Sequence, residues 1–137
     1  MISSKTPSGA TLEITVAPFE DAKALEKEVF RALGGTDISG KEMMTIAMLA
    51  ASSDAVEAAF FKCAARAIYK PTGADDSAVK VNRALFDDPK TAEQARGDYY
   101  DIFYKVAEAN IKPFIQALFS ALKGIQGDLR TAPPPSK

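Results

Sequence analysis

The most regular apolar pattern of the chain lies between Thr91 and Ile125, and it constrains the fold more than any other stretch. Its apolar and aromatic residues recur at steps of three and four, which places them on one face of a helix. In the first half of the stretch this face consists of Ala95, Tyr99, Ile102, Phe103, Val106 and Asn110. Pro113 lacks the N–H group that would bond to the Ala109 carbonyl, so we expect a kink or a break there. The stretch therefore predicts one long bent helix or two helices that meet at an elbow.

Residues around this stretch indicate where the helix begins and ends. Asp88-Pro89 offers an N-cap followed by proline, and Thr91–Gln94 forms a capping-box pattern one turn later. Beyond Pro113, a second segment carries apolar residues to about Gly124. They are Phe114, Ile115, Leu118, Phe119 and Leu122. Three consecutive prolines near the C-terminus cannot continue a helix, so residues 127–137 are expected to form a Pro-rich disordered tail.

The beginning of the chain predicts one short strand. Residues 1–10 are polar and are expected to be flexible, whereas Leu12, Ile14 and Val16 alternate with polar residues as in a half-buried strand. A single strand is not stable by itself. The strand needs a partner strand, either near Val79–Val81 or in another chain. If the partner is in another copy of the chain, the protein is a homo-oligomer, and this alternative stays open.

Three further helices are predicted between the strand and residue 69. The first has an inner stripe of Ala22, Leu25, Val29 and Leu33. The second follows a capping-box pattern at Ser39–Glu42 and is apolar nearly all round. The predicted helices run from Pro18 to Gly34, from Met43 to Ala51 and from Asp54 to about Tyr69, and residues 69–81 form the main loop.

The length and composition fit one folded domain. A chain of 137 residues can bury a real core, and its apolar content of 47% argues against wholesale disorder. We therefore expect a mainly α fold: a single small helical domain over residues 11–126, with four to five helices, a short N-terminal strand and a long Pro-kinked C-terminal helix. No apolar run approaches the length of about 18 residues that a transmembrane helix needs, so no membrane partner is expected.

The residue types argue against catalysis and against nucleic-acid binding. The chain has no histidine, which removes the commonest general base and a leading metal ligand. Its one cysteine, Cys63, lies among apolar residues and is expected to be a buried, unreactive thiol. The phosphate-binding patterns GxxxxGK[ST] and GxGxxG are absent, and the net charge is −1. We expect no enzyme, no cofactor, no metal and no nucleic-acid partner.

Apolar and aromatic residues outside the main stripe are the candidates for partner binding. Methionine is adaptable and is favoured on surfaces that accept varied partners. Adjacent aromatic residues on a helix point about 100° apart, so one of each pair can face outward. The candidates are Met43, Met44, Met48, Phe61, Phe114, Leu118 and Phe119. The alternative interpretation, which is the commoner use of such residues, is that they fill the core.

Several segments of the chain resemble the tail assembly chaperones of long-tailed, siphovirus-type bacteriophages. The resemblance spans roughly residues 11–120. It is carried by Leu12-Glu-Ile-Thr-Val-Ala-Pro-Phe-Glu-Asp-Ala22, Leu85-Phe-Asp-Asp-Pro89, Ala95-Arg-Gly-Asp-Tyr-Tyr-Asp-Ile-Phe103 and Val106-Ala-Glu-Ala-Asn-Ile-Lys-Pro-Phe114.

This resemblance implies a small helical protein without enzymatic activity that acts in the cytoplasm of the infected cell. Such proteins bind the hydrophobic tape measure protein, help to recruit tail tube subunits, and are not expected in the mature virion. Two alternatives stay open: a structural tail completion or connector subunit, and a small helical protein-interaction adaptor. Finding the chain in purified virions would favour the structural subunit.

Overall fold

The computed structural model describes residues 1–35, 37, 39–73 and 78–131, with side chains up to position 116. This part of the chain forms five α-helices, two short 3-10 helices and a four-stranded antiparallel sheet. The elements are β1 (Ile2–Lys5), β2 (Thr11–Ile14), α1 (Phe19–Leu33), α2 (Met43–Ala51), α3 (Asp54–Cys63), η1 (Ala64–Arg66), β3 (Ile68–Lys70), β4 (Val79–Lys80), η2 (Arg83–Phe86), α4 (Ala92–Gly97) and α5 (Tyr99–Thr131). The fold is mainly helical, as expected, but it is mixed rather than all-α.

The sheet has the strand order β1-β2-β3-β4. Leu12 and Ile14 of β2 are buried and alternate with half-buried residues, as the sequence pattern predicts, but the strand ends before Val16, which is 51% exposed. Leu12 lies opposite Ser4 of β1 and Tyr69 of β3. The partners of the predicted strand are therefore β1, in a segment that was expected to be flexible, and β3, in a segment that was assigned to a helix end and a loop.

The predicted partner near residue 79 exists, but it pairs elsewhere. β4 begins at Val79 and bonds to β3, not to β2. The chain reaches β3 because α3 ends at Cys63, η1 follows, and Ala67 is extended. Ile68 and Tyr69 are residue types that suit a pleated, partly buried surface, and pairing on both sides satisfies their backbone groups.

The helix boundaries in the first half of the chain agree well with the sequence pattern, but their caps differ. α1 begins after Pro18 and ends at Gly34, as expected. α2 has Glu42 at its N-cap without a side-chain bond, so the predicted capping box at Ser39 does not form. Ser53 caps α3 by accepting a hydrogen bond from the Val56 N–H at 3.4 Å.

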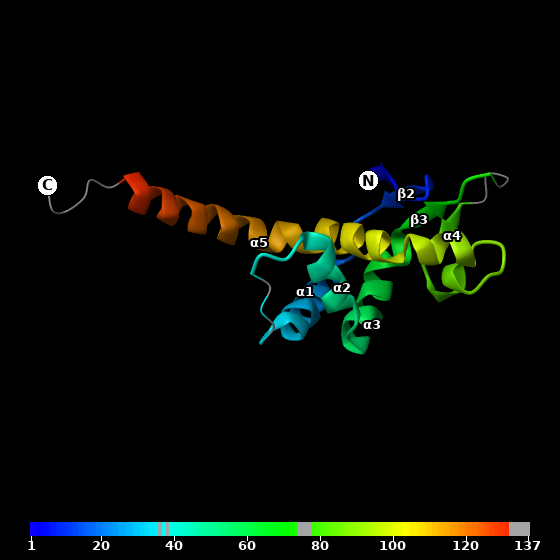
Figure 1. The fold of residues 1–137 in the computed structure, drawn as a ribbon, viewed down its shortest axis with the longest axis horizontal. Helices are drawn as coiled ribbons and strands as arrows, with labels where there is room; N and C mark the ends of the chain where they lie inside the picture. Colours follow the sequence, from blue (N-terminus) through cyan, green and yellow to red (C-terminus); the bar gives the residue numbers. More distant parts are fainter. Residues whose placement is uncertain (36, 38, 74–77, 132–137) are drawn as a thin grey trace, which may run out of the picture.

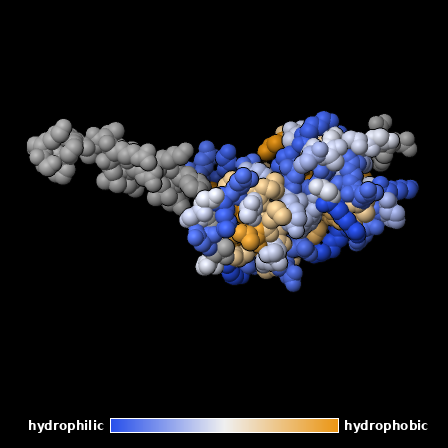
Figure 2. All heavy atoms as spheres, viewed as in Figure 1, coloured by the Kyte–Doolittle hydropathy of each residue, from blue (hydrophilic) through white to orange (hydrophobic). Residues whose placement is uncertain are grey.

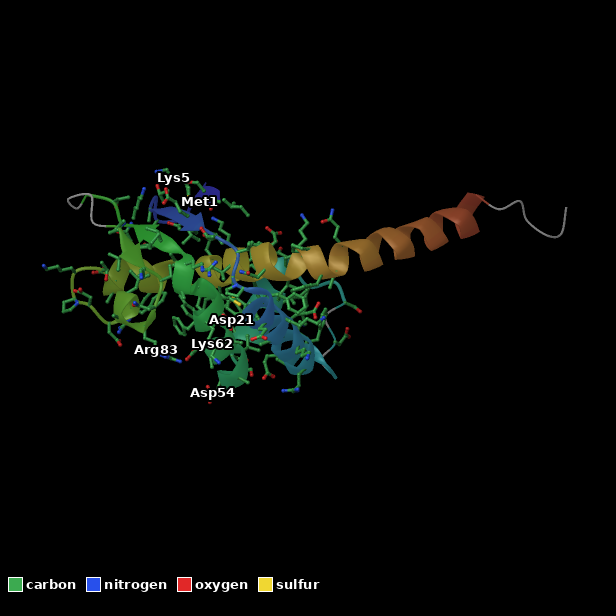
Figure 3. The ribbon with its side chains drawn as sticks, turned by 180° about the vertical axis from the view of Figure 1, so that it is seen from behind. Met1, Lys5, Asp21, Asp54, Lys62 and Arg83 are labelled. Carbon is green, nitrogen blue, oxygen red and sulfur yellow. The ribbon has the colours of Figure 1, made fainter. Side chains whose placement is uncertain are left out.

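α5 is the element on which the core is built. In Figures 1 and 3, α1, α2 and α3 lie on one side of it, and its N-terminal half runs past the sheet. Ile102, Phe103 and Val106 are buried, and the Phe103 ring lies 5.2 Å from the Phe60 ring of α3. The apolar face predicted for this stretch is therefore the face that packs against the core.

The start of the long helix differs from the prediction. The chain breaks at Asp98 into the short α4 and the long α5. Thr91 precedes α4 but makes no capping bond, and its hydroxyl donates to the Leu85 carbonyl at 2.8 Å instead. The break places the buried Asp98 between two helices, where its carboxylate meets other elements.

Beyond Pro113, α5 continues without interruption to Thr131. The alternative of two separate helices is therefore not observed, and the predicted bend at Pro113 stays a prediction. The helix also extends past the expected end near Gly124. Of the tail expected to be disordered, residues 132–137 lie outside the described part of the chain.

Asn110 joins α5 to the segment that precedes α1. Its Oδ1 accepts a hydrogen bond from the Ala17 N–H at 2.8 Å, and its Nδ2 donates to the Val106 carbonyl at 2.8 Å. The residue is only 3% exposed although it is polar. A polar residue therefore occupies the apolar stripe because its side chain bonds both to the backbone of α5 and to the backbone of the segment before α1.

Replacing Asn110 with alanine is expected to lower the free energy of unfolding by about 1–3 kcal/mol, because the Ala17 N–H loses its acceptor. Urea denaturation measures this change. The exposed Gln116→Ala is the control, with an expected change within about 0.5 kcal/mol. Equal stability of Asn110→Ala and the wild-type protein would show that the link contributes nothing.

Candidate partner-binding groove

An apolar groove lies between α1, α2 and α5, with a volume of about 430 Å³. Figure 2 shows apolar surface over α1 and α2. Its lining residues are almost all apolar, and the charged residues among them are Glu108 and Lys112. The full lining is Val29, Phe30, Leu33, Met43, Ile46, Ala47, Ala50, Phe103, Tyr104, Ala107, Glu108, Ile111, Lys112 and Ile115.

The apolar character of α2 has a simple structural explanation. The helix buries its small residues, Ala47, Ala50 and Ala51, against the core. Its larger residues remain outside: Met43 is 60% exposed and Met48 is 44% exposed. Alanines let helices approach closely, so the core can be closed without the methionines. For Met43 and Met48 the core-filling interpretation is therefore wrong.

The structure separates the residues that the sequence singled out for partner binding. Met43 lines the groove, whereas Met44 is half-buried and Met48 is exposed beyond the lining. The Phe114 ring packs edge-on against Phe19 of α1 at 5.6 Å. Phe61 lies in a different hollow. The side chains of Leu118 and Phe119 lie outside the described residues.

Sequence reasoning missed the contribution of α1 to the groove. Val29 and Leu33 were assigned to the inner stripe, but both are only partly buried and also line the groove. Phe30 was not singled out, and it is 53% exposed on the rim. Its position three residues before Leu33 is the signal that would have placed it on this face.

A second, more polar hollow lies where η2, α3 and the start of α5 meet. Its volume is about 380 Å³. Aromatic rings and arginines line it, and Arg83 lies 4.6 Å from the centre of the Phe61 ring. Arg83 also pairs with Glu57 at 2.9 Å, and Figure 3 shows it at the outer edge of the molecule. Because the arginines here have carboxylate neighbours, the hollow carries no clear excess of charge.

The Tyr99 hydroxyl of this second hollow is buried without a hydrogen-bond partner among the described residues. Burial, helped by the negative charge of Glu57, raises the pKa of Tyr99 to about 12. The phenol is therefore neutral at physiological pH. It offers one polar atom in an otherwise aromatic wall, which is too little to define a ligand.

The remaining chemistry of the described residues is sparse. Cys63 is buried as expected, and burial together with the nearby Asp21 raises the pKa of its thiol to about 12. No cluster of three or more metal-ligating side chains occurs among the described residues. Within the same residues, no single helix is long and apolar enough to span a membrane. α2 and the α3–η1 segment reach that threshold only together, with a bend of 105° between them.

Comparison of the chain with known protein families, with curated proteins and with solved structures found no match. The likeness to phage tail assembly chaperones therefore depends on the sequence segments quoted above.

Proposed function

We propose that this protein is a binding protein without enzymatic activity, and that it holds an apolar helix of a partner in the groove between α1, α2 and α5. The observation that carries the proposal is the groove itself, an apolar channel with exposed Met43 and Phe30 at its rim. Grooves of this kind bind the apolar face of an amphipathic helix. Methionine adapts to different side chains, which suits a partner of variable sequence.

The sequence resemblance suggests which partner this is. Tail assembly chaperones bind the tape measure protein, which is long, helical and hydrophobic. We therefore propose that the chain is a tail assembly chaperone, acting in the cytoplasm of the infected cell, and that segments of the tape measure protein occupy the groove. Recruitment of tail tube subunits is part of the same proposal and needs a second surface.

Met43→Asp tests the groove, with Met48→Asp as a matched control on the same helix. Both side chains are exposed, so both variants are expected to fold. Of these two methionines, only Met43 lines the groove. An unpaired charge buried at an interface costs about 3–5 kcal/mol, so Met43→Asp is expected to bind the tape measure protein at least about 100-fold more weakly.

The measurement is co-expression with the tape measure protein of the same phage, followed by pull-down and by titration with helical peptides from it. Met48→Asp is expected to bind like the wild-type protein. A folded Met43→Asp variant that binds with unchanged affinity would place the partner elsewhere. Failure of the wild-type protein to bind any tape measure segment would contradict the proposed function.

A further inference from the structure

The C-terminal half of α5 leaves the body of the molecule. Among the residues of α5 whose side chains the structure describes, Ile115 is the last that packs against the core, and the helix continues to Thr131. At about 1.5 Å per residue, this projection is roughly 24 Å long. Figures 1 and 3, which view the molecule from opposite sides, both show it extending away from the other elements.

The projecting segment has the composition of a covered helix. Between residues 113 and 127, Lys123 is the only charged residue. A helix surrounded by water is expected to carry charged residues on its exposed sides, and most helical stability comes from packing of an apolar face. The composition therefore indicates that another surface packs against this segment.

The apolar face of this segment continues the groove. Three residues of α5 line the groove along its face: Ala107, Ile111 and Ile115. At 100° per residue, they lie within a sector of about 100° around the helix axis. Leu118, Leu122 and Ile125 occupy the same sector of the helix by their spacing. One uninterrupted face thus begins in the groove and runs along the projection.

We propose that two copies of this chain pair through α5 in antiparallel orientation, so that the projecting half of each helix lies in the groove of the other copy. One chain then supplies both an uncovered apolar groove and an apolar helix that needs a cover. A twofold axis close to residue 118 brings position 111 of one copy next to position 125 of the other. The contact occurs twice in a closed dimer, as twofold symmetry requires.

This pairing goes beyond the proposed function and affects it. The second copy covers the surface that we assign to the partner helix, so self-association and partner binding compete. That competition rests on the proposed function, whereas the dimer does not. Dimer formation is therefore tested on the purified chain alone, without a tape measure protein.

Sedimentation equilibrium of the full chain is expected to give twice the protomer mass of 14.6 kDa at micromolar concentration. Leu118→Asp places a charge in the paired face and is expected to give a monomer. Ser120→Asp adds the same charge on the opposite side of the same helix and is expected to remain a dimer. Met43→Asp, which changes the groove, is also expected to give a monomer.

A cysteine cross-link tests the orientation. Cys63 is the chain's single cysteine, so a Cys63→Ala background has no other thiol. In that background, an oxidised mixture of Ile111→Cys and Ile125→Cys chains is expected to form the mixed intermolecular disulfide, and neither variant alone is expected to cross-link. Disulfide dimers of each variant alone, without the mixed product, would show a parallel pairing and overturn the antiparallel arrangement.

The possible results separate this inference from the proposed function. A monomeric wild-type chain, or a Leu118→Asp variant that stays dimeric, would overturn the pairing. If the monomer still binds tape measure peptides through Met43, the proposed function stands without the dimer. A dimer that binds none of these peptides would leave the pairing intact and contradict the proposed function.

Discussion

Replacing Phe103 with alanine is expected to lower the free energy of unfolding by about 3–5 kcal/mol, the range for removing a large aromatic side chain from a core. Phe103 is 1% exposed, and its ring packs against Phe60 of α3. The cavity left by the ring would lie where α5 meets its neighbours. Ile102→Ala, at a position that is fully buried, is expected to cost about 2–5 kcal/mol.

Thermal or urea unfolding measures both effects. Phe30→Ala is the matched control, because it removes the same side chain from a position that is 53% exposed. Its expected change is within about 0.5 kcal/mol. If Phe103→Ala melted like Phe30→Ala, the core would not lie along this face of α5.

Replacing Asp98 with alanine is expected to lower the free energy of unfolding by about 3–5 kcal/mol. The carboxylate accepts hydrogen bonds from the Ser8 N–H at 3.1 Å, the Ser8 hydroxyl at 2.5 Å and the Tyr69 hydroxyl at 2.7 Å. A hydrogen bond to a charged group contributes about 1.5–3 kcal/mol, and neighbouring bonds are not additive. The variant would leave three donors without this acceptor.

The control for this variant is Asp87→Ala, which removes an exposed carboxylate that lies 3.5 Å from Arg96. An exposed pair of this kind contributes less than about 1 kcal/mol. A double-mutant cycle between Asp98→Ala and Tyr69→Phe isolates the buried Tyr69 bond. Additive effects in that cycle would contradict the direct interaction.

The same network predicts a change of stability with pH. Burial alone would raise the pKa of Asp98, but the hydrogen bonds donated by Ser8, Thr6 and Tyr69 outweigh it and hold the pKa below its ordinary value of 3.8. The folded state therefore binds fewer protons at this site than the unfolded state does. The stabilisation is complete above about pH 3.8 and is lost as the pH falls through the lower folded-state pKa.

Urea denaturation between about pH 5 and pH 2.5 compares the wild-type protein with Asp98→Asn. The other carboxylates are common to both proteins, so the difference between the two curves reports Asp98. The difference in stability is expected to shrink as the pH falls. A constant difference would show that Asp98 has the same pKa in the folded and unfolded states.

The helices of this protein are largely determined by local sequence. The apolar spacing predicts the position of α1 and the core-facing residues Ile102, Phe103 and Val106 of α5, because a period of 3.6 residues is a property of neighbouring residues alone. Pro18 and Gly34 mark the ends of α1 for the same reason. The alternation in β2 likewise predicts which of its residues are buried.

The sheet and the polar network required the tertiary structure. β3 was assigned to a helix end and a loop because its three residues show no period long enough to recognise, and only pairing with β2 and β4 makes them a strand. The sequence pattern places Asp98 within a continuous helix. Its role depends on Ser8, which is 90 residues away in the chain. No local pattern contains such a contact.

The position of the groove likewise depends on the tertiary structure. The sequence alone determined that α2 is apolar on nearly every side, which left core filling and partner binding as alternatives. Only the packing of Ala47, Ala50 and Ala51 against the core shows that Met43 is left outside. A residue's periodicity sets its direction on a helix, but which direction is covered depends on where the other helices lie, and that is set by contacts between segments far apart in the chain.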